Sequence, residues 1–194
     1  MADRARLVLA SASPRRLALL RQIGVEPDAV VAADADETEL PGELPRDYVL
    51  RVALAKAAVI RAVETASLVL AADTAVACGR RILPKTEDEA AARMCLELMS
   101  GRAHRVFSGI ALISPEGIAR SRVVETRVKV ARLEAQDIAA YVASGEWRGK
   151  AGGYAIQGLF SKHVISIVGS YSNIVGLPLY ETANLLKGSN WRPA

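Results

Sequence analysis

Cysteine and histidine are scarce in this sequence, which limits the chemistry open to it. The chain contains two cysteines, Cys78 and Cys95, and two histidines, His104 and His163. Their spacing does not resemble that of a zinc site, and a reducing compartment would leave both thiols free. We therefore expect all four to be packing residues.

Long apolar runs are also missing. No apolar stretch approaches the ~20 residues that a helix needs to cross a bilayer. The N-terminal residues Met-Ala-Asp-Arg-Ala-Arg lack the apolar region of a signal peptide. We expect a cytoplasmic protein without a membrane partner.

Aromatic residues make up only 5% of the chain, and the net charge of +4 comes from scattered basic residues. A non-specific nucleic-acid binder would show a basic run or stripe. An anionic small molecule explains the basic excess equally well, so we expect no stable nucleic-acid partner.

The remaining composition is that of an ordinary globular protein. Of the 194 residues, 51% are hydrophobic and 24% are charged, which is enough for a full hydrophobic core. There is no repeat, low-complexity tract or linker longer than a few residues. We expect one domain covering residues 1–194.

The order of apolar runs and helical patterns predicts an α/β protein. Strands are expected at 7–10, 28–33, 68–72, 104–113, 118–132 and 164–168, with a hairpin over 75–83. Helices are expected at 14–23, 45–64, 86–100, 134–144 and 176–186.

Asp73 and Thr74 are the first candidates for chemistry, because they follow the apolar run Leu68-Val69-Leu70-Ala71-Ala72. A buried strand that stops at a carboxylate and a hydroxyl delivers both groups to a rigid rim, where α/β proteins commonly build active sites. The alternative is that the two residues leave the strand as a solvated turn.

A phosphate cradle is predicted after the first strand. Ser13 is the expected N-cap of a helix with Pro14 at its first position. Arg15 and Arg16 in the first turn oppose the helix dipole, so they cost stability unless an anion is bound between them. Together with the hydroxyls of Ser11 and Ser13 and the backbone N–H groups, they could hold phosphate. The alternative is a solvated arginine pair.

The acidic segment 34–39, which includes Asp36 and Glu37, could hold a hard divalent cation through carboxylate oxygens. It could equally be a solvated loop. The pattern Asp34-x-Asp36-x-Thr38 also resembles the nucleophile motif of haloacid-dehalogenase-type phosphatases. Those enzymes need a later pair of acids after a strand, and none appears here.

Two lysines fall at positions where an anion would be favoured. Lys56 lies on the predicted apolar stripe of its helix, so its ammonium either reaches solvent or points into a cleft. That stripe consists of Val49, Val52, Val59 and Val63. Lys85 precedes a predicted capping box formed by Thr86 and Glu89, and its charge adds to the positive helix end unless it is simply exposed.

Four glycines lie within the ten residues from Gly149 to Gly158. They permit a close approach of the backbone to a ligand, although they also suit a plain loop. The segment Gly145 to Lys150 is not a P-loop, because it is one residue short and lacks the Ser or Thr after the lysine.

Taken in order, these motifs resemble the Maf family of nucleoside triphosphate pyrophosphatases along nearly the whole chain. The matching stretches are Ser11 to Arg16, Asp36-Glu37, Leu54 to Ala57, Ala72 to Thr74, Lys85, Ser100 to Arg102, Lys150 to Gly152, Ile156 to Gly158 and Gly176 to Leu179. The family's usual Lys-Pro pair appears as Lys85-Thr86, and Gly149 replaces a common acidic residue.

The resemblance implies a mixed β-sheet flanked by helices, with a central cleft between two lobes, as in Maf and ITPase-like proteins. It implies hydrolysis of a nucleotide to its monophosphate and pyrophosphate with Mg²⁺ or Mn²⁺, in a homodimer. Arg15, Thr74 and Gln157 match the branch that acts on dTTP and UTP. An older association of the family with septum formation leaves a regulatory binding role as a second hypothesis.

Each predicted site residue has an expected role. Asp73 would take a proton from water or orient it, and Glu37 and Asp73 would hold the metal. Lys56, Lys85, Arg15 and Arg16 would neutralise charge on the phosphates. Ser11 and Ser13 would donate hydrogen bonds to the phosphates, and Thr74 and Gln157 would read or shape the base pocket.

Overall fold

The computed structural model describes residues 5–189 and 191, so both ends of the expected domain lie outside the described residues. A mixed sheet runs through this part of the chain in the order β2-β1-β3-β5-β6-β7, with β4 paired to β3. Its strands are β1 (Leu7–Ala10), β2 (Ala29–Val31), β3 (Leu68–Cys78), β4 (Arg81–Leu83), β5 (Ala103–Ile113), β6 (Ala119–Val130) and β7 (Val164–Val168). β1 pairs in parallel with β2 and β3, and all other pairs are antiparallel.

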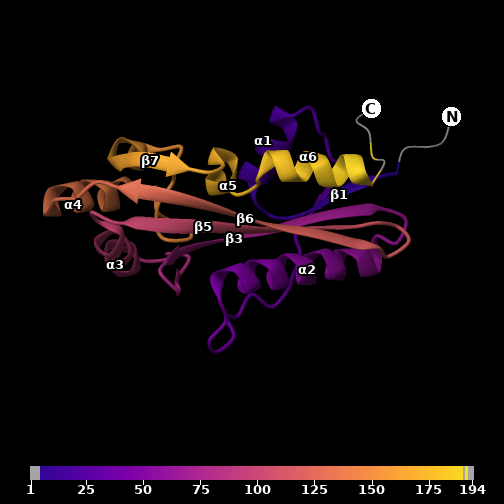
Figure 1. The fold of residues 1–194 in the computed structure, drawn as a ribbon, viewed down its shortest axis with the longest axis horizontal. Coiled ribbons are helices and arrows are strands. Elements are labelled where there is room, and N and C mark those ends of the chain that lie inside the picture. The colour runs from indigo at the N-terminus through magenta and orange to yellow at the C-terminus, as the bar shows by residue number, and fades with distance from the viewer. Residues whose placement is uncertain (1–4, 190, 192–194) are drawn as a thin grey trace.

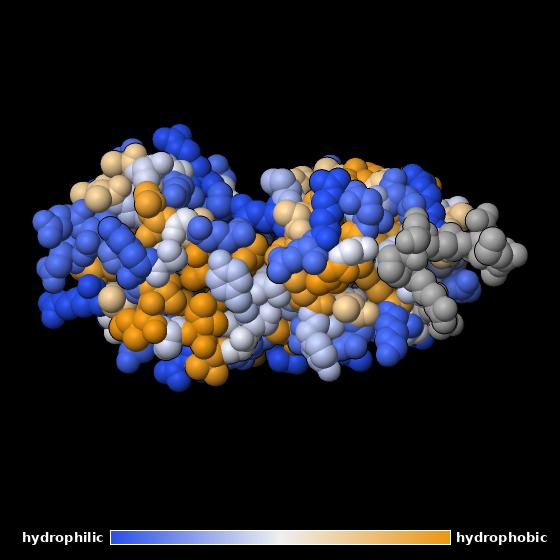
Figure 2. All heavy atoms as spheres, turned by 90° about the horizontal axis from the view of Figure 1, so that it is seen from above, coloured by the Kyte–Doolittle hydropathy of each residue, from blue (hydrophilic) through white to orange (hydrophobic). Residues whose placement is uncertain are grey.

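Helices lie on both faces of this sheet (Figure 1). They are α1 (Pro14–Gln22), α2 (Pro45–Val63), α3 (Glu89–Met99), α4 (Ala135–Ser144), a 3-10 helix (Leu159–His163), α5 (Tyr171–Val175) and α6 (Leu179–Gly188). The expected mixed sheet flanked by helices is thereby confirmed. Seen from above, the surface is hollowed between the two ends of the molecule (Figure 2).

The core follows the alternation of side chains along the strands. Leu68, Leu70 and Ala72 of β3 join the larger apolar cluster, which also includes residues of α1, α3, α4 and α6. Val69 and Ala71 point to the opposite face and pack beneath α2. No helix in the described part of the chain combines the length and apolar character needed to span a membrane.

The predicted end of a strand at Asp73 and Thr74 is wrong, because β3 continues to Cys78. On one side, β3 pairs continuously with β5 from Val69 to Ala77, which carries the extended backbone past the carboxylate. On its other side, the pairing with β1 ends at Ala71 and the pairing with β4 begins at Val76. Asp73 and Thr74 therefore lie beside a gap in the sheet, with side chains on opposite faces.

Helix α2 reaches this gap because β5 has a glycine beneath it. Gly109 pairs with Asp73 across the sheet. A Cβ atom at Gly109 would collide with the backbone of Val49 and Leu50. The missing side chain thus lets the helix backbone lie directly on the strand opposite the candidate carboxylate.

We expect Gly109→Ala to lower the free energy of unfolding by about 1 to 3 kcal/mol, the usual cost of overpacking a close contact. Because α2 carries Lys56, the same change should shift the cavity residues and reduce activity. Urea unfolding together with turnover measures both effects. An alanine variant of wild-type stability would show that α2 can move away without cost.

The predicted apolar stripe of α2 is only half right. Val49 and Val52 are fully buried, but Val59 is 41% exposed and Val63 is 75% exposed. Ala53, Ala57 and Ile60 fill the core in their place. The buried face of this helix is lined by small residues because the sheet is so close.

Two further boundaries differ from the predictions. The N-cap of α3 is Asp88, whose carboxylate accepts a hydrogen bond from the Ala91 N–H, so the predicted capping box of Thr86 and Glu89 does not form. The short helix α5 precedes Gly176, and α6 begins at Leu179 rather than at the glycine. Ser170 caps α5 through Asn173, a local signal that the sequence analysis missed.

The four scarce residues have no shared metal site. Both thiols are free, and no cluster of three metal-ligating side chains occurs within residues 5–189 and 191. His104 is buried, and its Nε2 lies 2.7 Å from the Tyr154 hydroxyl. Burial lowers the pKa of His104 to about 4, so the ring is neutral near pH 7.

Candidate active site

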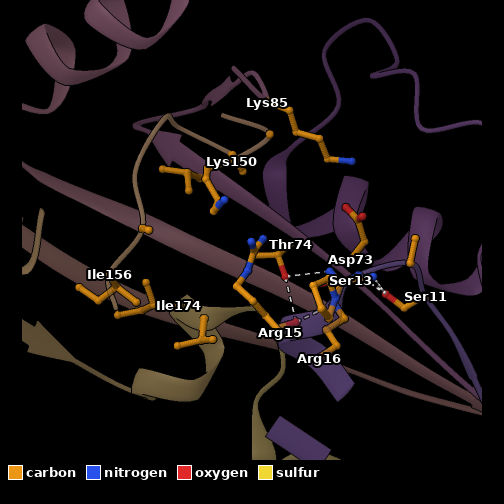
Figure 3. A pocket seen from close by; sticks show the side chains of 18 of the residues that line it. Ser11, Ser13, Arg15, Arg16, Asp73, Thr74, Lys85, Lys150, Ile156 and Ile174 are labelled. Atoms are coloured by element: carbon orange, nitrogen blue, oxygen red, sulfur yellow. Dashed lines mark hydrogen bonds between the residues drawn. The ribbon is translucent and has the colours of Figure 1, made fainter. Parts of the chain in front are cut away.

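A cavity of about 420 Å³ occupies the gap beside β3. All ten side chains predicted from the sequence as site residues line it, and Figure 3 labels those of the β1–α1 turn together with Asp73, Thr74 and Lys85. They come from the β1–α1 turn, the acidic loop, α2, β3, the segment after β4 and the glycine-rich loop. These residues are Ser11, Ser13, Arg15, Arg16, Glu37, Lys56, Asp73, Thr74, Lys85 and Gln157.

Asp73 stands at one end of a chain of alternating charges. Its Oδ1 accepts a hydrogen bond of 2.7 Å from Lys56 Nζ, which also lies 2.7 Å from Glu37 Oε1. The other oxygen of Glu37, Oε2, accepts a 2.5 Å hydrogen bond from Lys85 Nζ. Asp73 and Lys56 are only 3% and 6% exposed. Lys56 therefore points into the cleft, the second of the two orientations considered from the sequence.

The loop that carries Glu37 is held in place by α2. The Tyr48 hydroxyl donates to the Glu37 carbonyl at 3.0 Å, and Arg51 donates to the Thr38 carbonyl at 2.8 Å. Arg51 also forms a bidentate pair with Glu43 at the end of this loop. The acidic loop is therefore docked on the helix rather than freely solvated.

The charge of Glu37 depends on its two lysines. Partial burial acts to raise the pKa of Glu37, but the hydrogen bonds and positive charges of Lys56 and Lys85 outweigh it and lower the pKa below its ordinary value. Glu37 is thus a carboxylate at neutral pH, with one lysine on each of its oxygens.

Arg16 is held rigidly by the protein. Its guanidinium donates to the Gly176 carbonyl at 2.9 Å, to Ser11 Oγ at 3.1 Å and to Thr74 Oγ1 at 3.3 Å. Thr74 Oγ1 in turn lies 2.8 Å from Ser108 Oγ. Arg16 is a fixed positive charge at the cavity wall, and the Thr74 hydroxyl is one of the groups that fix it.

Arg15 differs from its neighbour. Across the described ranges, its side chain makes no hydrogen bond or ion pair, and it extends toward Lys150 on the other side of the cavity (Figure 3). Burial lowers the pKa of Lys150, and the charge of Arg15 lowers it further. Two cations that line the same cavity favour the binding of an anion there.

The start of α1 adds to this anion-binding wall. Ser13 is the N-cap and Pro14 occupies the first helical position, as predicted. The Ser13 hydroxyl makes no capping hydrogen bond, and the first turn contains no acidic residue. The positive end of the helix dipole therefore points at the cavity, and no acidic residue in the first turn offsets it.

The glycine-rich loop lies against the segment after β4. Lys85 and Ala151 form an antiparallel bridge, and the Thr86 hydroxyl donates to the Trp147 carbonyl at 2.7 Å. Gly152 and Gly153 have positive φ angles, and a Cβ on either would press on Val76 or Thr86. Thr86 is thus an anchor of this loop rather than a helix cap.

Gln157 lies at the rim of a well-supported turn. The Ala155 N–H donates to the Tyr141 hydroxyl at 3.0 Å, and the Leu159 N–H donates to Glu146 Oε2 at 2.8 Å. The Gln157 side chain itself is exposed and faces both the main cavity and an adjoining groove of about 280 Å³ along α1. Its amide is therefore free to contact a ligand.

Sequence reasoning missed two polar lining residues, Glu87 and Tyr154. It placed Lys150 in a stretch that matches the family, but it gave this lysine no role of its own. Glu87 and Tyr154 carried no local signal, because they enter the cavity only through the pairing of Lys85 with Ala151.

The phosphatase-like pattern in the acidic loop receives no support from the geometry. Asp34 and Asp36 are exposed and do not line the cavity. The Asp36 carboxylate instead accepts a hydrogen bond from the Thr38 N–H at 2.8 Å. A covalent role for either carboxylate would require it to leave this position.

The donor set fits a hard divalent cation. Glu37 Oε1 and Asp73 Oδ1 lie 2.7 Å from the same Lys56 nitrogen, so the two oxygens are within twice that distance of each other. Mg²⁺ is usually held by one or two carboxylates together with substrate phosphates and waters. Glu37 and Asp73 would supply those carboxylates.

Comparison with known proteins finds one matching family and several relatives of high sequence identity. A family model described as Maf-like protein matches residues 6–189. A dTTP/UTP pyrophosphatase from Paramagnetospirillum magneticum is 61% identical over 187 residues, which cover 96% of this chain and 98% of the relative. A protein of the same name from Caulobacter vibrioides is 58% identical over 187 residues, covering 96% and 97%.

Among solved structures, a HAM1 protein from Coxiella burnetii has a similar fold, with a TM-score of 0.51. It is 15% identical, and the match covers 95% of this chain and 99% of that one. At this identity the likeness shows the fold alone.

Proposed function

Since this chain belongs to the family of Maf-like proteins, we propose that it hydrolyses dTTP and UTP to the nucleoside monophosphate and pyrophosphate. The family resemblance predicted from the motifs is confirmed. The high identity to relatives named dTTP/UTP pyrophosphatase, over almost the full length of both chains, supports the activity. We also propose, from the resemblance, a cytoplasmic homodimer.

One observation carries this proposal: a buried carboxylate, Asp73, borders a cavity with more cations than anions. Arg15, Arg16, Lys56, Lys85 and Lys150 line the cavity, against Glu37, Asp73 and Glu87. A triphosphate would compensate this excess, and its scissile bond would lie near the buried carboxylate. Reactions at phosphorus use a group that positions the nucleophile and cations that stabilise the charge on the phosphates. This cavity offers both.

The proposed reaction begins with a water molecule positioned by Asp73. The water oxygen attacks the α-phosphorus, its proton passes to the Asp73 carboxylate, and the bond from the α-phosphorus to the bridging oxygen breaks. Pyrophosphate leaves with the bridging oxygen and its electron pair. Lys85 and Lys150, which reach the cavity from the same side, would neutralise the charge of the leaving group.

The wall formed by α1 would hold the remaining phosphate oxygens. Arg15 and the Ser13 hydroxyl, which have no internal partner within residues 5–189, would contact them directly. Arg16, fixed by Ser11 and Thr74, would act as a stationary charge behind them. Bound Mg²⁺ or Mn²⁺ would supply charge stabilisation for the phosphates at Glu37 and Asp73.

The test is a panel of dTTP, UTP, ATP and GTP with Mg²⁺ or Mn²⁺ in ¹⁸O-labelled water. We expect orthophosphate to appear only after inorganic pyrophosphatase is added, and the label to appear in the nucleoside monophosphate. Immediate orthophosphate would favour a phosphatase instead. No turnover of any nucleotide, together with tight binding of a protein partner, would favour the regulatory role.

We expect Arg15→Ala to raise KM for dTTP about tenfold, because one charged hydrogen bond at a solvated rim is lost. Without ligand, stability should stay unchanged or rise by about 0.3 to 1 kcal/mol, since a cation leaves the positive helix end. Steady-state kinetics and urea unfolding measure the two effects.

Arg21→Ala is the matched control for this variant. Arg21 lies at the other end of α1 and pairs with Glu26 in solvent, so its removal should leave KM unchanged. Loss of stability in Arg15→Ala without a change in KM would make Arg15 a structural residue.

A further inference from the structure

We propose that Lys56 acts as a built-in counter-ion that occupies the carboxylates of Glu37 and Asp73 until nucleotide arrives, so that the free protein binds divalent metal weakly. This inference rests on the proposed function for the identity of the nucleotide. It concerns the order in which ligands enter the cavity. Metal and triphosphate would bind together, while the Lys56 ammonium leaves the two carboxylates and contacts the phosphates.

The contacts of Lys56 carry the proposal. Its ammonium lies 2.7 Å from Glu37 Oε1 and 2.7 Å from Asp73 Oδ1, between the two carboxylates that would hold a metal. Glu37 has no free oxygen, because its Oε2 is bonded to Lys85. Only one oxygen of Asp73 is engaged by a lysine. A cation that approached both carboxylates would therefore meet an ammonium already in place.

The electrostatic setting makes this competition strong. Lys56 and Asp73 are almost fully buried, so solvent screens the ammonium poorly. A divalent ion placed beside both carboxylates would lie close to a positive charge unless Lys56 moved. Its flexible four-carbon stem allows such movement, and a triphosphate would offer it new oxygens in the same cavity.

The lysines of the cavity allow a matched comparison. Lys56 touches both carboxylates, Lys85 touches only Glu37, and Lys150 touches neither, since its amino group donates to the Arg148 carbonyl. All three line the same cavity. Removing each charge in turn separates direct competition for the carboxylates from the general effect of a less positive cavity.

The experiment measures Mn²⁺ binding to nucleotide-free protein by the electron paramagnetic resonance signal of free Mn²⁺. Lys56→Met should tighten Mn²⁺ binding more than about tenfold, because a contact between like charges in a poorly screened site exceeds that factor. Lys85→Met should give a smaller gain, and Lys150→Met less than about threefold. Equal affinities in Lys56→Met and Lys150→Met would overturn the proposal.

A second measurement uses an α,β-imido analogue of dTTP, which cannot be cleaved at the scissile position. In the wild type this analogue should strongly tighten Mn²⁺ binding, because its phosphates draw Lys56 from the carboxylates. In Lys56→Met the factor by which the analogue tightens Mn²⁺ binding should be several-fold smaller, since no lysine at position 56 occupies the carboxylates. Equal coupling in both proteins would contradict a handover by Lys56.

Folding of the variants is checked separately, because Lys56→Met leaves two carboxylates without their shared partner. Lys56→Gln keeps a hydrogen-bond donor without the charge, and it should also tighten Mn²⁺ binding. Circular dichroism and the Mn²⁺-induced rise in Tm report on both variants. These readouts need no turnover, so the metal competition can fail while pyrophosphate release stands, or the reverse.

Discussion

Asp73→Asn should reduce kcat for dTTP by about 10² to 10⁴-fold, the range expected when a general base is removed. The amide keeps the shape of the side chain and can still accept a hydrogen bond from Lys56, but it cannot take a proton and binds a cation poorly. Asp73 is buried beside the cavity, whereas the other carboxylates that line it, Glu37 and Glu87, are more exposed. The measurement is single-turnover and steady-state pyrophosphate release at saturating Mn²⁺.

The control for this variant is Asp137→Asn, which removes the same charge from the capping box of α4, outside the residues that line the cavity. It should leave kcat unchanged. Asp73→Asn must also retain its circular dichroism spectrum and a cooperative urea transition. A folded Asp73→Asn variant with a near wild-type rate would show that the carboxylate serves only to neutralise Lys56.

Several members of the candidate site could be predicted from the sequence because they lie on local signals, whereas Gln157 was indicated only by the family resemblance. Arg15 and Arg16 oppose a helix dipole, and Lys56 interrupts an apolar helix face. Such conflicts between a residue and its local environment are where functional sites are expected. The cavity then brings these separate signals together.

The relations among those members could not be predicted, because they depend on long-range pairing. The strand β3 continues past Asp73 because β5 pairs with it, and Gly109 on β5 decides how close α2 can lie. Likewise, Thr86 looked like a helix cap because Glu89 follows it. Its hydroxyl instead donates to the carbonyl of Trp147, and this long-range contact shows that Thr86 anchors the glycine-rich loop.

The second large effect is expected at Gln157, one of the two residues that could set the preference for pyrimidine nucleotides. Gln157 is free at the cavity rim, whereas the Thr74 hydroxyl is engaged by Ser108 and Arg16. We therefore propose that Gln157 contacts the base and that Thr74 shapes the pocket by fixing Arg16. A glutamine amide offers both a donor and an acceptor, which match the N3–H and carbonyl edge shared by uracil and thymine. An ionised glutamate offers only acceptors.

Gln157→Glu should accordingly lose much of the preference for UTP and dTTP over ATP and GTP. Once the bound base covers this side chain, a pyrimidine carbonyl facing a carboxylate costs roughly 1 to 3 kcal/mol, or about 5- to 150-fold in kcat/KM. Steady-state kinetics with the four nucleotides measure this change. Gln22→Glu places the same charge in the adjoining groove of α1 and should leave the ratios intact. If both variants lowered all four rates equally, Gln157 would act through the charge of the cavity and not through the base.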